Sequence, residues 1–196
     1  MIAIMKKFTN IVLLSICATL TGCLVPEKFV ASVTLKPDAS YTYKYDGTAA
    51  FAMALLAIRD KGSLPAKDEA GLRADAEKSK KNPLFKKFDY VGQGRYELVL
   101  DEQVAEGNQP TQMKFFSVIK DKDSVYSITQ LPIKPNDAAQ LKTLGVNVNG
   151  KFDVVLPSDF VVLSHNAKSA PGVFSKAYSW DIKAVETPVT IKFKRK

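Results

Sequence analysis

The sequence predicts one α+β domain: a mostly antiparallel, strongly curved sheet or open barrel, with two or three helices packed on one side. Most of the chain alternates apolar and polar residues with a period of two, which is typical of half-buried strands. Short turns separate these stretches, and this favours antiparallel pairing of neighbours. Only three stretches have helical character instead.

The first two strands carry the clearest alternation. We expect strands over residues 29–35 and 41–45, ended by Pro37-Asp38 and by Asp46-Gly47. In each strand the apolar or aromatic side chains fall on alternate residues and therefore share one face. These faces consist of Phe29, Ala31, Val33 and Leu35 in the first strand, and of Tyr41, Tyr43 and Tyr45 in the second.

Two helices are expected next. Residues 49–60 are apolar on nearly every side, whereas residues 65–81 are charged, with Ser63 as a candidate cap and Glu69 one turn before Arg73. A short third helix is expected over residues 136–144, capped by Asn136 and stopped by Gly145. The other segments predict strands near residue 87 and over residues 95–100, 114–120, 124–131, 146–156, 160–165, 178–185 and 189–194.

The tetrapeptide Leu20-Thr21-Gly22-Cys23 ends a short apolar run that follows Lys6 and Lys7. A charged start, an apolar stretch and small residues form a secretory signal, and this stretch is shorter than the ~20 residues that span a bilayer. The tetrapeptide resembles the lipobox of bacterial lipoproteins. That resemblance implies cleavage between Gly22 and Cys23, a diacylglyceryl thioether on Cys23, and usually a third chain such as palmitate on its amine. An ordinary cleaved signal and an uncleaved N-terminal anchor stay open as alternatives.

The expected organisation follows from this signal: a removed leader over residues 1–22, a lipidated N-terminus and short tether over 23–28, and one domain over 29–196. Leu24, rather than an aspartate, follows the cysteine. By resemblance to enterobacterial sorting, this favours the outer membrane, facing the periplasm, over the inner membrane. A tether of this length reaches less than ~20 Å, so we expect the domain to lie against the bilayer.

The composition limits the partners. The chain carries a formal charge of +8, and loss of Lys6 and Lys7 with the leader would leave +6. An exported basic protein is expected to meet an anionic membrane or a cell-wall polymer rather than nucleic acid, but the lysines themselves are interpreted first as a solvated face. Cys17 leaves with the leader, and Cys23 is expected to be alkylated. We therefore expect no disulfide and no cysteine metal ligand.

No catalytic or metal-binding constellation is visible. His165 is the single histidine and is interpreted as structural, because no second histidine or free cysteine accompanies it. Ser117 and Lys120 have the S-x-x-K spacing of penicillin-binding serine enzymes, but on a strand residues three apart point to opposite sides. Asp121 and Asp123 are interpreted as a polar turn, since two carboxylates are too few for a calcium loop.

Two apolar features are the strongest candidates for binding. Residues 49–58 form either a core helix or the wall of a groove for an acyl chain or a partner helix. The aromatic faces of two strands either belong to the core or present their polar tips to a sugar or headgroup. The candidate ligand-facing residues are Tyr41, Tyr43, Tyr45 and Trp180.

The C-terminal third has a characteristic order of features. A strand led by Gly150 ends at Pro157, a second strand ends at His165-Asn166-Ala167, and a third contains Trp180. This order resembles the LppM-like domain of bacterial lipoproteins and membrane-anchored envelope proteins, in which Pro-Gly and Asn-Gly precede a Trp-containing strand. The chain departs from it at Ser158 and Ala167, which replace the glycines. The resemblance implies a curved β domain near a membrane, and it brings no catalytic residues.

We therefore expect a non-enzymatic envelope lipoprotein: a binding or assembly module that needs no cofactor and is held close to the membrane through Cys23. Its partner would be a lipid, a cell-wall polymer or another envelope protein. The alternative is a carboxylate-dependent hydrolase that acts on cell-wall or lipid substrates. A cleft with two carboxylates about 5–9 Å apart would favour the hydrolase.

Overall fold

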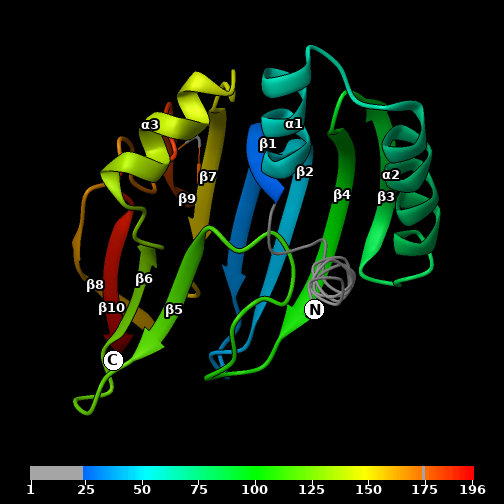
Figure 1. Ribbon diagram of the computed structural model, residues 1–196. Coiled ribbons are helices and arrows are strands. Elements are labelled where there is room, and N and C mark those ends of the chain that lie inside the picture. Colours follow the sequence, from blue (N-terminus) through cyan, green and yellow to red (C-terminus); the bar gives the residue numbers. More distant parts are fainter. Residues whose placement is uncertain (1–23, 174) are drawn as a thin grey trace, which may run out of the picture.

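The computed structural model describes residues 24–173 and 175–196 (Figure 1). The predictions on the leader, on Gly22 and on Cys23 lie outside these residues. None of the described helices is long and apolar enough to cross a membrane.

The described residues form ten strands in two sheets, of six and four strands. The larger sheet has the order β3-β4-β2-β1-β7-β9 and the smaller has the order β5-β6-β10-β8. The strands are β1 Leu24–Leu35, β2 Tyr41–Phe51, β3 Phe85–Gly92, β4 Arg95–Val104, β5 Phe116–Lys120, β6 Tyr126–Gln130, β7 Asn149–Val155, β8 Phe160–His165, β9 Ala177–Ile182 and β10 Thr190–Arg195. The helices are α1 Ala52–Lys61, α2 Ala66–Ser79 and α3 Pro135–Thr143.

The α+β class and the antiparallel character are confirmed. Among the described strands, β1 and β7 make the one parallel pair. The architecture differs from a single curved sheet in one respect. The hairpin of β5 and β6 pairs with β10 rather than continuing from β4, so a second sheet forms and no barrel closes.

One core joins the two sheets. The inward faces of β1, β2 and β7 pack against the smaller sheet; the Tyr43 and Phe116 rings, for example, lie 5.0 Å apart. At the other end of the larger sheet, α2 packs on β3 and buries Leu72 and Ala76. The larger sheet is therefore covered on one face by two separate layers, which Figure 1 shows side by side.

The ends of several elements differ from the sequence-based prediction. The segment expected as a tether, Leu24–Lys28, is part of β1. Helix α1 starts at Ala52 rather than at residue 49, because Ala49 and Ala50 continue β2 and pair with β4. Helix α3 starts at Pro135, and neither it nor α2 has a side-chain cap, so the capping roles expected of Asn136 and Ser63 are wrong.

Candidate functional site

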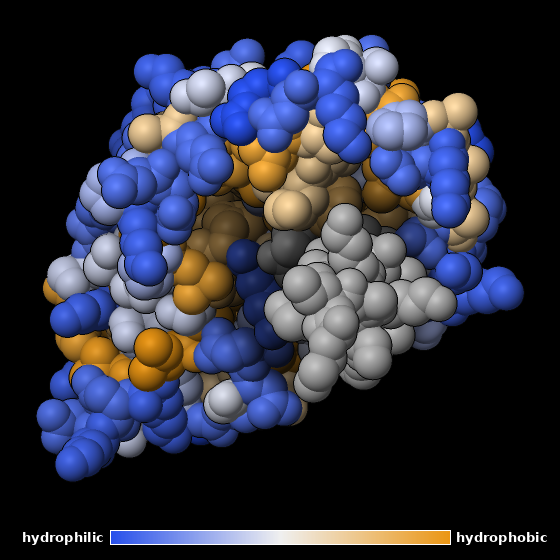
Figure 2. All heavy atoms as spheres, viewed as in Figure 1, coloured by the Kyte–Doolittle hydropathy of each residue, from blue (hydrophilic) through white to orange (hydrophobic). Residues whose placement is uncertain are grey.

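An apolar groove lies between the two sheets, at the end where β1 begins. Its volume is about 230 Å³, and its walls come from the start of β1, from the residues around β5 and β6, from α3 and from the segment after β9. Figure 2 shows this face hollowed between the half that carries α3 and the half that carries α1, with hydrophobic residues on the walls. The groove is thus built from segments that are distant in the sequence.

A second cavity, of about 490 Å³, continues from the first. Four apolar residues line both cavities: Ile133, Leu141, Val148 and Val185. Leu141 belongs to α3, and no residue of this helix is buried. Burial of apolar surface is the main force that holds a helix on a protein. Helix α3 therefore lies, without a fully buried residue, where the apolar groove meets the second, more polar cavity.

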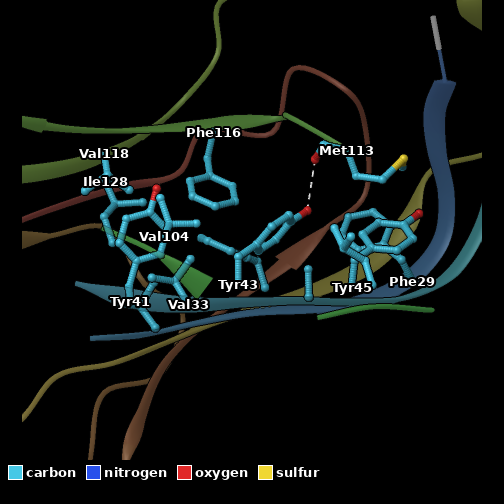
Figure 3. Close-up of a cluster of buried hydrophobic side chains, with 14 of the residues drawn as sticks. Phe29, Val33, Tyr41, Tyr43, Tyr45, Val104, Met113, Phe116, Val118 and Ile128 are labelled. Carbon is cyan, nitrogen blue, oxygen red and sulfur yellow. Dashed lines mark hydrogen bonds between the residues drawn. The ribbon is translucent and has the colours of Figure 1, made fainter. Parts of the chain in front are cut away.

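The wall formed by Lys114 and Phe115 is fixed from inside the core. The Tyr43 hydroxyl is fully buried and donates a hydrogen bond of 2.9 Å to the carbonyl oxygen of Met113, which Figure 3 shows. Met113 itself is buried and has a φ of 47°, an uncommon conformation for a residue with a side chain. The Phe115 ring then packs 5.3 Å from the Phe29 ring, and both rings line the groove.

The charge around the groove is sparse. Lys114 is the one charged side chain among the described lining residues, and it is exposed at the rim. The polar lining residues are Gln130 and Thr187. No carboxylate among the described residues lines the groove, and Glu186 lines the neighbouring cavity. This arrangement suits an apolar chain whose polar end stays outside.

The structure places the four predicted ligand-facing aromatics in the core, and none of them lines either cavity. Their polar atoms have partners: the hydroxyls of Tyr41, Tyr43 and Tyr45 donate to backbone carbonyls, and Trp180 Nε1 donates to Asn166 Oδ1 at 2.7 Å. Burial raises the pKa of each of these tyrosine hydroxyls well above its ordinary value. Of the two alternatives left open by the sequence, core or ligand surface, the structure shows the core.

The other candidates have local structural roles. His165 is exposed at the end of β8, where its Nδ1 accepts from the Ala167 N–H and its ring contacts Tyr178. The Ser117 hydroxyl lies 3.2 Å from the hydroxyl of Thr129 on the paired strand. Asp121 accepts two backbone N–H groups within its turn. No group of three or more metal-ligating side chains gathers within the described residues.

Sequence reasoning missed the groove itself. The candidate wall over residues 49–58 lies mostly in α1, and it does not line the groove; Leu55 packs instead with Ala50 and Val146. One signal was available in the sequence. Leu131-Pro132-Ile133 is an apolar tripeptide in a connection that has no strand or helix, and Leu131 stays 38% exposed.

No family model matches the chain, and no curated protein matches it. Among the solved structures, the NMR structure of the folded domain of the LppM protein of Mycobacterium tuberculosis is similar to it. The identity is 13%, the match covers 88% of this chain and 90% of that chain, and the TM-score is 0.38.

Proposed function

We propose that this chain is an envelope lipoprotein, held to the membrane through acylated Cys23, that works as a non-enzymatic binding module for lipid acyl chains. The observation that supports it is the apolar groove at the start of β1. Each methylene that leaves water for such a groove contributes about 0.8 kcal/mol. A chain of several methylenes therefore binds measurably even after the cost of immobilising it.

The groove favours a lipid over the other partners that the sequence allows. A sugar polymer needs many hydrogen-bonding side chains, whereas most residues that line this groove are apolar. A carboxylate hydrolase needs two acids in one cleft, and no described lining residue of the groove is an acid. Lys114 at the rim is suited to an anionic headgroup that remains in water.

The position of the groove agrees with a place at the membrane surface. Leu24 and Val25 line it, and they directly follow the residue proposed to carry the lipid. Since this segment belongs to β1 rather than to a loose tether, the anchor holds the groove at a short, fixed distance from the bilayer. The residue after Cys23 favours the outer membrane, facing the periplasm, as the location.

Native lipid extraction tests the binding role. The mature chain is made with Cys23→Ser behind an ordinary cleaved leader, so that it is exported without an anchor, and it is purified from the soluble periplasmic fraction of its own cells in lipid-free buffer. We expect mass spectrometry to find a lipid bound in near-stoichiometric amount. Leu131→Glu, in the groove, should remove it, whereas Leu163→Glu, on β8 away from the groove, should not; both side chains are partly exposed, so both variants should fold. A groove that is reproducibly empty in the parent chain would redirect the search to protein partners.

A further inference from the structure

The N-terminal end of β1 is held rigidly at the groove. Leu24 pairs with Phe51, and Val25 pairs with Ala50, in the middle of the larger sheet. Leu24, Val25 and Pro26 also line the groove. Leu24 is joined to the preceding residue by one peptide unit, which spans about 3.8 Å between Cα atoms. An acyl chain attached to that residue would therefore be linked to a described lining residue of the groove, Leu24, by a single peptide unit.

We propose that the resident occupant of the groove is one acyl chain of the protein's own lipid on Cys23, so that a foreign chain enters only by exchange. The inference rests on the acylation and on the chain-binding groove of the proposed function. It adds a regulatory property to the same site: the membrane-bound protein is closed to free lipid at rest, and it opens when its own chain withdraws into the bilayer.

One acyl chain can leave the bilayer without releasing the protein from the membrane. The resemblance to bacterial lipoproteins implies two acyl chains on the thioether of Cys23 and usually a third on its amine, and two buried chains are sufficient to hold a protein firmly on a membrane. The third chain gains a similar apolar environment in the groove and in the bilayer, since both remove its methylenes from water. Occupancy is therefore decided by proximity and by packing against the walls, not by the hydrophobic effect alone.

Proximity favours the attached chain over a free lipid. A ligand that is joined by a short link binds as if it were present at about millimolar concentration, and it has already lost most of its translational freedom. A free lipid must supply that cost from its own contacts. The thioether and amide links on Cys23 are also uncharged, so they can lie beside Leu24 and Val25 without an ionic partner.

The cover over the groove is suited to exchange. Helix α3 contributes Leu141 to both cavities, although none of its residues is buried. Moving this helix uncovers no fully buried side chain of its own, only the partly buried Leu141 that packs against the cluster of Leu55 and Val146, so the free-energy cost of opening is modest. A withdrawing chain and an entering chain can then use the same space beneath α3.

Cross-linking from the protein's own lipid tests this inference. Cells that make the full chain are fed a fatty acid with a diazirine near its end, and their membranes are irradiated. We expect cross-links within one molecule, from the Cys23 peptide to the groove peptides that contain Leu131 or Val148. Leu131→Glu should reduce these cross-links strongly, and Leu163→Glu should leave them unchanged. Cross-links to phospholipid only, with none to the groove, would overturn the inference.

A binding comparison separates this inference from the proposed function. A fluorescent fatty acid is titrated into the Cys23→Ser chain and into the acylated chain held in nanodiscs. Self-occupancy predicts that the acylated protein binds the probe at least roughly 10-fold more weakly than the Cys23→Ser protein, because its own acyl chain competes at high effective concentration. Equal binding by both proteins would refute self-occupancy while supporting the groove as a binding site. Absence of binding by the Cys23→Ser chain would refute both.

Discussion

Replacement of Tyr43 by phenylalanine removes one buried oxygen and tests how the groove wall is held. The Tyr43 hydroxyl donates a hydrogen bond of 2.9 Å to the carbonyl oxygen of Met113, and the Tyr43 side chain is fully buried. Loss of this bond leaves a buried carbonyl without its partner, which costs about 1–2 kcal/mol. For a domain of this size, each kcal/mol lowers Tm by about 2–4 °C.

Urea unfolding followed by the fluorescence of Trp180, the single tryptophan, measures the loss directly. The slope of the transition should stay constant while the midpoint falls. Because Met113 directly precedes Lys114 and Phe115 in the groove wall, binding of a fluorescent fatty acid should weaken as well, by about 5-fold if 1 kcal/mol of positioning is lost.

Tyr178→Phe is the matched control. Tyr178 is partly buried, and its hydroxyl makes no hydrogen bond to the residues that the structure describes, so the change should cost less than about 0.5 kcal/mol. Equal stability losses in the two variants would show that the bond from Tyr43 to Met113 does not stabilise the wall. Unchanged lipid binding in Tyr43→Phe, despite the expected loss of stability, would refute the link between this bond and the groove.

Three further results follow from buried groups. Arg95→Gln should lower the free energy of unfolding in urea by about 2–4 kcal/mol, because it leaves the buried Glu27 carboxylate without the guanidinium 3.0 Å away. Adding Glu27→Gln should recover most of the lost stability. A double variant as unstable as Arg95→Gln alone would contradict this account of the ion pair. Burial raises the pKa of Tyr90 to about 12 from 10.0, so its contribution to stability should be complete below pH ~10 and fall as the pH rises towards 12. In thermal melts, Tyr90→Phe should therefore lose less stability at alkaline pH than the parent chain does. An identical loss in both proteins would count against this role of Tyr90. Gly150→Ala should lower the free energy of unfolding by about 1–3 kcal/mol, because the added Cβ would lie 2.4 Å from the Phe29 ring. Chemical denaturation should show that adding Phe29→Leu restores part of this stability. A Gly150→Ala variant as stable as the parent chain would contradict the close approach.

The strands were predictable because their alternation is local. The faces of residues 29–35 and 41–45 lie in the core as their period-two pattern indicates. The helix expected from residue 49 was misplaced because alanine is compatible with both states, and pairing of Ala49 and Ala50 with β4 decided for the strand. Tertiary contacts of this kind leave no signature in a short apolar run.

The groove could not be predicted for a related reason. Its lining residues come from short stretches between Leu24 and Val189, and each stretch contains only a few half-buried apolar side chains. Nor does the sequence reveal that β6 pairs with β10, which separates the smaller sheet from the larger and leaves the space between them. A site that depends on the packing of two layers appears only when the pairing of strands is known.

The parallel pairing of β1 with β7 also bears on how the chain acquires its structure. Thr34 pairs on one side with Thr42, which is on the next strand along the chain. On its other side it pairs with Val155, which lies roughly 120 residues later in the sequence. Contacts between such distant segments form slowly, because the entropy of a long loop must be lost first. A polypeptide that is exported amino end first would therefore present one edge of β1 without hydrogen-bond partners until residue 155 has crossed. An open edge recruits strands from other molecules, so an exported chain with this topology would depend more on a chaperone that shields it after translocation than a chain built from hairpins alone.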